Sequence, residues 1–220
     1  MAISDLRDAL RADSIEVLDL LGSGPLPYLQ VLEDQRSIHK EVVRGERDST
    51  LLLLEHTSIF TAGKRTEDHE RPITASPVID VDRGGKITWH GPGQLVGYPI
   101  IRLRNPEELV GFVRVLEGAI IDSLGAYGID ADRVAGRSGV WIEGRRKIAA
   151  IGIRVAQGVA MHGFAVNVNC SLAAYDEIIP CGIDDAEVTS ISKELGQEVT
   201  IAHFLPTIKD TMTIALQELI

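Results

Sequence analysis

The sequence predicts an α+β fold in which helices pack against a mixed, mostly antiparallel sheet. Strand-like segments follow one another in runs instead of alternating one by one with helices, and this pattern favours α+β over a doubly wound parallel sheet. Two long segments carry apolar residues at helical spacing and would supply the packing helices. Of the 220 residues, 45% are hydrophobic and 25% are charged, which suffices for a complete core. Because no linker divides the chain, we expect a single domain over residues 1–220.

The first half of the chain is expected to contain one helix and a series of strands. Residues 14–20 alternate like a half-buried strand, and residues 50–55 form an apolar run typical of a central strand. Between them, residues 25–47 place apolar side chains at the spacing of an amphipathic helix. Residues 63–72 are polar and charged, which indicates a loop. Short strands separated by glycine-rich turns are predicted at 77–82, 86–90 and 95–103.

The second half has a similar mixture. Residues 106–127 are predicted to form an amphipathic helix, with Asn105 suited to cap its start. Residues 200–219 have helical spacing, but we expect Pro206 to break or kink a helix there. Between these helices, strands are predicted at 139–142, 147–156 and 160–169.

Composition and charge restrict the class of protein. The net charge is −10, which argues against a nucleic-acid partner, because phosphate neutralisation needs a basic surface. The N-terminus lacks the basic flank and apolar run of a signal peptide, and no apolar stretch is long enough to cross a bilayer. We therefore expect a cytoplasmic protein without a membrane partner, in which both cysteines, Cys170 and Cys181, are reduced. Cys170 is expected to be a small buried side chain.

One segment of this acidic chain is basic. Residues 133–154 contain six lysines and arginines against one acid, whereas residues 155–220 contain two lysines against nine acids. The basic segment could receive an acidic partner, or it could be a strand whose charged side chains simply face water. The sequence leaves both interpretations open.

Common metal and cofactor motifs are missing from the sequence. Neither Gly63-Lys64 nor Gly85-Lys86 is followed by the Ser or Thr of a phosphate-binding loop. The histidines and the two cysteines lack metal-ligand spacing. We therefore expect neither a metal nor a cofactor.

What stands out instead is a set of dense, polar, glycine-rich segments. They read DRGGKITWHGPGQ (82–94), GRSGVW (136–141), RKIAAIG (146–152), HGFAVN (162–167), IPCGI (179–183) and VTS (188–190). In this order the segments resemble the octanoyl-[acyl-carrier-protein]:protein N-octanoyltransferase family of lipoate biosynthesis, whose fold is related to that of lipoate and biotin protein ligases. The resemblance extends from about residue 51 to residue 190.

The resemblance implies an acyltransferase that begins protein lipoylation. It would move octanoyl from acyl carrier protein to the ε-amine of a lysine on a lipoyl domain. The acceptors would be lipoyl domains of 2-oxoacid dehydrogenase E2 subunits and the glycine cleavage H protein. Because thioester to amide is downhill, no ATP is required. Acyl carrier proteins are acidic, so Arg145 and Arg146, with Arg102 and Arg104 as additions, are candidates for a docking face.

The resemblance also implies which residues form the site. Cys181 matches the family's acyl-thioester nucleophile, and Lys147 matches the lysine that lowers its pKa. The segments that match those holding the acyl substrate comprise Arg83, Gly84, Gly85, Lys86, Ile87, Thr88, Trp89, His90, Ala150, Ile151, Gly152, Gly163, Phe164 and Ala165.

Elementary chemistry supports this assignment independently. A free cysteine has a pKa of ~8.5, so only a few per cent is thiolate near neutral pH. A lysine ammonium ~4 Å away is worth up to ~4 kcal/mol at an effective dielectric of ~20, before desolvation is subtracted. In the second step the acceptor lysine must lose a proton, and we expect Lys147 or His90 to take it. The acyl tunnel should be apolar, with Val140, Ile151, Phe164 and Val166 as expected liners.

Three other functions are compatible with parts of the sequence. An ATP-dependent lipoate or biotin ligase of the same fold class would not need Cys181. An amidotransferase would take its acyl group from another acylated lipoyl domain. A non-enzymatic acyl-carrier or lipid-binding module would keep its activity when Cys181 is replaced.

Overall fold

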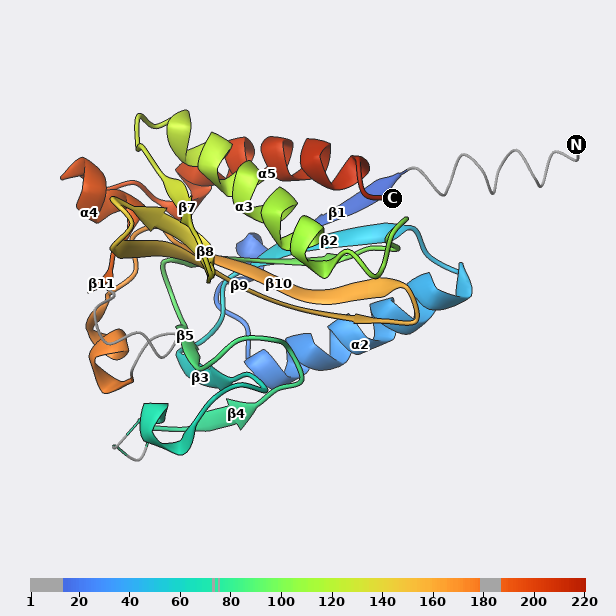
Figure 1. The fold of residues 1–220 in the computed structure, drawn as a ribbon, viewed down its shortest axis with the longest axis horizontal. Coiled ribbons are helices and arrows are strands. Elements are labelled where there is room, and N and C mark those ends of the chain that lie inside the picture. Colours follow the sequence, from blue (N-terminus) through green and yellow to red (C-terminus); the bar gives the residue numbers. More distant parts are fainter. Residues whose placement is uncertain (1–13, 73, 75, 179–186) are drawn as a thin grey trace, which may run out of the picture.

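The computed structural model describes residues 14–72, 74, 76–178 and 187–220, which form two sheets packed with helices (Figure 1). Most neighbouring strands are antiparallel, while β1–β2, β9–β11 and β3–β4 are parallel. The predicted α+β class with a mixed, mostly antiparallel sheet is confirmed. The larger sheet has the order β1 (Ile15–Asp19), β2 (Ser49–Leu54), β6 (Gln94–Ile100), β10 (Val159–Asn167), β9 (Arg146–Ala156), β8 (Arg137–Ile142) and β7 (Asp132–Val134), with β11 (Glu187–Val188) beside β9. The smaller sheet has the order β4 (Val78–Asp80), β3 (Ile59–Ala62) and β5 (Thr88–His90).

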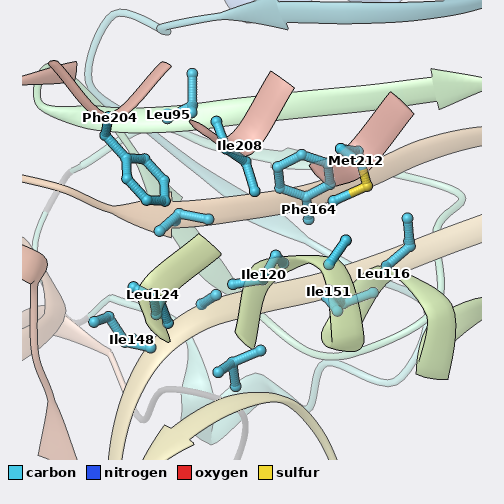
Figure 2. Close-up of a cluster of buried hydrophobic side chains, with 14 of the residues drawn as sticks. Leu95, Leu116, Ile120, Leu124, Ile148, Ile151, Phe164, Phe204, Ile208 and Met212 are labelled. Atoms are coloured by element: carbon cyan, nitrogen blue, oxygen red, sulfur yellow. The ribbon is translucent and has the colours of Figure 1, made fainter. Parts of the chain in front are cut away.

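Two helices cover one face of the larger sheet. α3 (Leu109–Gly125) and α5 (Ile201–Gln217) lie side by side across it (Figure 1). Side chains from both helices interdigitate with those of the strands, and burial of each Leu-sized or Phe-sized side chain contributes about 1.5–3 kcal/mol. Figure 2 shows the centre of this core, which includes Leu95, Leu116, Ile120, Leu124, Ile148, Ile151, Phe164, Phe204, Ile208 and Met212.

A single long helix, α2 (Tyr28–Arg44), packs on the other face (Figure 1). Its buried residues recur every three or four positions, as the sequence pattern predicts. Val31, Ile38 and Val42 join Leu52, Val96 and Tyr98 in a second apolar cluster. The helix ends at Gly45, whose φ of +71° is the left-handed conformation that glycine adopts without strain.

The break or kink that Pro206 was expected to cause does not occur, because α5 runs continuously through it. Pro206 is exposed and lies near the start of the helix, so the carbonyl that loses a partner, four residues earlier, can bond to water. Phe204, Ile208 and Met212 are fully buried on the opposite side. Their packing fixes the helix more strongly than one missing hydrogen bond weakens it.

Other differences concern element boundaries and short elements. Asn105 does not cap α3, which begins at Leu109 after Glu108, without a side-chain cap. The short strands β3 and β7 were not predicted from the sequence. Three 3₁₀ helices (Leu21–Ser23, Asp68–Glu70 and Ala173–Glu177) and the short α4 (Ile191–Leu195) occupy connecting segments. In the described part of the chain, no helix has both the length and the apolar character needed to span a membrane.

Candidate active site

A cavity of ≈ 280 Å³ lies on the α2 side of the larger sheet. Its floor consists of four small residues on β9 and β10, where Gly152 pairs with Gly163 and Ala150 pairs with Ala165. Residues directly opposite each other on neighbouring strands point to the same face. Four small side chains in a square therefore leave a hollow in the sheet surface. The volume is close to the lower end of the ~300–1,000 Å³ that is typical of small-molecule pockets.

Two of these positions require glycine because the backbone is closely approached. A Cβ at Gly163 would collide with the carbonyl of Gly97 on β6. A Cβ at Gly152 would lie 2.9 Å from Cδ of Arg83 and 2.9 Å from the carbonyl oxygen of Gly84. The second contact allows the loop at 83–88 to lie directly over the floor and form a wall of the cavity.

Arg83 organises this wall. Its guanidinium is buried and donates to the carbonyl oxygen of Thr61 at 2.8 Å and to that of Lys86 at 2.9 Å. These bonds tie the loop to β3 and close it on itself. The Lys86 ammonium pairs with Glu67 and with the fully buried Glu70. The loop therefore presents Ile87 and Thr88 to the cavity from a braced backbone.

Lys147 lies at one end of the cavity, near the start of β9. It is only 7% exposed, and its ammonium nitrogen lies 5.1 Å from the centre of the Trp141 ring, a cation–π contact. On its other side is Gly139, whose N–H donates to Oε1 of the buried Glu117 at 2.9 Å. Glu117 also pairs with Arg114 at 2.6 Å and with Arg133 at 3.3 Å. A buried ionic cluster thus fixes the backbone beside Lys147.

Tyr28, Tyr98 and His90 line the side of the cavity that faces α2, and His56 packs against all three rings. Nδ1 of His56 donates to the carbonyl oxygen of Leu26 at 3.0 Å, so Nε2 accepts a hydrogen bond from the Tyr98 hydroxyl at 2.7 Å. Burial lowers the pKa of His56 to about 4 and raises the pKa of Tyr28 to about 12. Both groups are therefore neutral near pH 7.

The tautomer of His90 follows from its neighbour Gln94. The Gln94 amide nitrogen donates to the carbonyl oxygen of Trp89 and to Oδ1 of Asn167, so the Gln94 oxygen accepts from Nδ1 of His90 at 2.8 Å. Nε2 of His90 is then unprotonated. Burial, aided by the nearby His56, lowers the pKa of His90 to about 3. His90 is therefore a fixed hydrogen-bond acceptor but a weak base.

His162 enters the cavity through an unusual backbone conformation. Strand alternation would place its side chain with Phe164 on the α3–α5 face, but its φ of +59° redirects it. Nε2 lies 2.8 Å from Oδ1 of Asp82, and Arg154 also pairs with Asp82 at 2.6 Å. Burial lowers the pKa of His162 to about 4. Its Nδ1 is buried and has no hydrogen-bond partner in the described part of the protein.

Cys181 lies outside the described residues. The chain re-enters the described region at β11, where Val188 pairs with Lys147 and the N–H of Thr189 donates to the carbonyl oxygen of Lys147 at 2.9 Å. In the sequence, position 181 precedes Val188 by seven positions.

Most of the predicted substrate-binding residues line this one cavity, and Lys147 lines it too. They are Arg83, Gly85, Lys86, Ile87, Thr88, His90, Ala150, Ile151, Gly152, Gly163, Phe164 and Ala165. Gly84 and Trp89 do not line it. The N–H of Gly84 donates to the carbonyl oxygen of Ile153, and Trp89 points into a separate apolar cluster, where its indole N–H donates to Ser58.

All four proposed tunnel residues belong to the α3–α5 core. Ile151 and Phe164 also border the cavity, whereas Val140 and Val166 do not. Cys170 is buried as expected, in the cluster around Trp89, and burial raises the pKa of its thiol to about 12. Seven lining residues were not among the predicted site residues, namely Tyr28, Arg65, Tyr98, His162, Gly136, Arg137 and Ser138. Gly136, Arg137 and Ser138 belong to the glycine-rich segment 136–141, and that segment could have been used to predict their place at the cavity.

Comparison with known proteins gives a consistent result. Residues 27–213 match the family model described as the lipoyl protein ligase A/B catalytic domain. An octanoyltransferase from Salinispora tropica is 55% identical over 197 residues, which cover 87% of this chain and 92% of that protein. An octanoyltransferase from Mycobacterium tuberculosis is 52% identical over 204 residues, covering 92% of this chain and 88% of that protein.

The fold is also found in a distant solved structure. A bi-partite lipoate protein ligase from Thermoplasma acidophilum superposes with a TM-score of 0.67, covering 92% of this chain and 82% of that one. At 15% sequence identity, this similarity concerns the fold alone.

Proposed function

This chain belongs to the lipoyl protein ligase A/B catalytic-domain family, and we propose that its cavity holds an octanoyl group in transit from acyl carrier protein to a lysine. The chain is an acyltransferase that transfers octanoyl in protein lipoylation, as its relatives at 52–56% identity are octanoyltransferases. It therefore uses an acyl donor and a lipoyl-related acceptor. The more specific partners belong to the proposal: acyl carrier protein as donor, and E2 lipoyl domains and glycine cleavage H protein as acceptors. The cytoplasmic location stays a prediction.

The observation that carries the proposal is the hollow formed by Gly152, Gly163, Ala150 and Ala165, which adjoins Lys147. A shallow hollow lined by small residues suits an unbranched alkyl chain, because it offers contact along its length without polar groups to desolvate. Lys147 lies at the end of the hollow where β11 joins β9. The segment that contains Cys181 precedes β11 in the sequence.

In the proposed first step, the Cys181 thiolate attacks the carbonyl carbon of the donor thioester. The bond from that carbon to the donor sulfur breaks, and the Lys147 ammonium gives a proton to the departing sulfur. Octanoyl is then bound to Cys181 as a thioester. Covalent catalysis of this kind divides one difficult transfer into two easier ones.

In the proposed second step, the acceptor amine attacks the Cys181 thioester, and its proton passes to the neutral Lys147. The amide forms, and the Cys181 thiolate and the Lys147 ammonium are regenerated. The sequence suggested His90 as the alternative acceptor of the amine proton. The lowering of its pKa to about 3 favours Lys147, because so weak a base takes a proton from an amine inefficiently.

The decisive test is to look for the acyl-enzyme. The protein is incubated with octanoyl-carrier in the absence of ATP, and intact mass spectrometry with peptide mapping locates the added octanoyl group. We expect it on Cys181 in the wild type and in a Cys170→Ser control, and no adduct in Cys181→Ser. Octanoylation of another side chain, or turnover by Cys181→Ser, would exclude the thioester mechanism. A requirement for ATP would indicate a ligase instead.

A further inference from the structure

The arginines that the sequence suggested as a docking face are bonded within the protein. Arg146 pairs with Glu194 at 3.0 Å and with Glu143 at 2.7 Å, and Arg145 pairs with Glu187 at 3.6 Å. Arg102 donates to the carbonyl oxygens of Val42 and Val43, and Arg104 to that of Ile220. The charges of Arg145 and Arg146 are therefore compensated by neighbouring carboxylates, while the guanidinium groups of Arg102 and Arg104 are held by main-chain oxygens. Arg145 and Arg146 provide little net attraction for an acidic partner.

A different basic site lies at the cavity itself. Lys64 and Arg65 are consecutive, and both are exposed. Their backbone is fixed because the N–H of Lys64 donates to the carbonyl oxygen of Arg83 at 3.1 Å and that of Arg65 to Gly85 at 3.1 Å. Arg65 lines the cavity. These two cations thus lie on the wall formed by the loop at 83–88.

The acidic residues close to this pair in the sequence have other partners. Glu67 and Glu70 pair with Lys86, and Asp68 and Asp80 pair with Arg71. Within the described residues, neither Lys64 nor Arg65 takes part in an ion pair, so no carboxylate of the described part compensates the two positive charges on this wall.

We infer that Lys64 and Arg65 form a docking site for the acidic surface of the carrier protein that delivers the acyl thioester. The inference rests on the proposed function and specifies where the donor binds. Long, exposed side chains at the rim of a cavity act mainly by attracting and orienting a protein of opposite charge. A tight phosphate site would instead use buried donors or a helix N-terminus. Because Arg65 lines the cavity, a carrier bound there holds its thioester beside the cavity.

The test compares charge reversals at low and high ionic strength. We expect Lys64→Glu to raise KM for octanoyl-carrier about threefold to tenfold at low salt, with little change in kcat. The difference should shrink at high salt, because exposed charges are screened over ~8 Å at 0.15 M. Arg65→Glu should raise KM in the same way. Lys40→Glu, which changes an exposed cation on α2 by the same charge, should stay close to wild type.

A second donor separates docking from chemistry. With octanoyl-pantetheine, which has neither protein nor phosphate, Lys64→Glu should turn over like the wild type. An unchanged KM for octanoyl-carrier in Lys64→Glu and Arg65→Glu would overturn the docking site while leaving the proposed function intact. An equal rise with octanoyl-CoA would overturn it too, since the bound anion would then be the donor's phosphate. If the wild type transfers octanoyl from no donor, the proposed function itself fails, and the docking site with it.

Discussion

Gly139 lies against the side chain of Lys147: a Cβ added to Gly139 would be 2.6 Å from Cε and 3.2 Å from Nζ of the lysine. Gly139 also has a φ of +110°, which side chains rarely tolerate, and it is fixed through its N–H by the buried Glu117. The absence of a side chain at position 139 is thus what gives the Lys147 ammonium its place at the cavity.

A Gly139→Ala substitution should therefore displace Lys147, and the added Cβ would also collide with the backbone carbonyl oxygen of Ala149. The backbone strain alone costs about 1–3 kcal/mol, so the melting temperature should fall as well. We expect the folded fraction to lose at least ~10-fold in kcat, because a general acid–base group typically contributes ~10²–10⁴-fold when it is well placed. The measurement is single-turnover octanoyl transfer on protein shown to be folded by circular dichroism.

Gly144→Ala is the matched control. Gly144 also has a positive φ, of +68°, but a Cβ there meets no atom within 4 Å. This variant should have the stability loss without the loss of kcat. Equal catalytic losses in both variants would mean that backbone strain, and not the position of Lys147, accounts for the effect.

Lys147→Arg should separate the charge of this residue from its role in proton transfer. A guanidinium stays positive and can still favour the Cys181 thiolate, but it cannot accept a proton near neutral pH. We expect the acyl-enzyme to form more slowly, because a guanidinium cannot give the departing donor sulfur its proton, and then to persist, because its transfer to the acceptor amine slows by ~10²-fold or more. Rapid-quench mass spectrometry measures both steps. Wild-type decay of the acyl-enzyme in this variant would remove Lys147 from the second step.

Ala150→Leu should shorten the acyl site. Ala150 is partly exposed in the cavity floor opposite Ala165, so three added carbons would occupy space that we assign to the alkyl chain. We expect kcat/KM to fall more than ~10-fold for octanoyl and much less for butanoyl, a reversal of ~1–3 kcal/mol in chain-length preference. Competition between the two donors gives the ratio directly.

The same exchange at Ala156 is the control. Ala156 is on the same strand but outside the cavity lining, near the turn to β10. Ala156→Leu should keep the wild-type preference. If the preference of Ala150→Leu is also unchanged, the alkyl chain does not lie over this part of the floor.

The cavity floor could be anticipated from the sequence because its residues are close together along β9 and β10. Gly152 and Gly163 come from two of the glycine-rich segments, and a single hairpin pairs them. Tyr28 and Tyr98 could not be anticipated, since each follows the apolar pattern of its own helix or strand. Only the packing of α2 against β6 places them at the cavity.

The errors have a physical cause as well. Phe164 and Val166 were both expected in the tunnel, but as alternate residues of β10 both point to the face that packs on α3 and α5. Phe164, which lies between Gly163 and Ala165, still borders the cavity, and Val166 does not. His162 departs from this alternation through its positive φ, and no pattern of residue types predicts such a conformation. The pairing of β9 with β10 therefore brings together the four predicted residues of the cavity floor. The positive φ of His162 is what directs one further side chain into the cavity.

The buried histidines should make the protein sensitive to mild acid. The pKa values of His56, His90 and His162 are lowered from 6.5 to about 4, 3 and 4, chiefly by burial. As pH falls below 6.5, the unfolded chain therefore takes up protons that the folded protein does not. The free energy of unfolding should be flat above pH ~6.5 and fall below it, by about 1.4 kcal/mol per pH unit for each histidine.

Urea denaturation between pH 7.5 and 4.5 measures this slope. His56→Gln should make the unfolding free energy less dependent on pH, by the equivalent of about one proton. The variant should also be less stable at every pH, because it loses the hydrogen bond from Tyr98. A stability that stays constant from pH 7.5 to 4.5 would contradict the lowered pKa values. It would mean that the cavity wall admits enough water to let these histidines take up protons in the folded state.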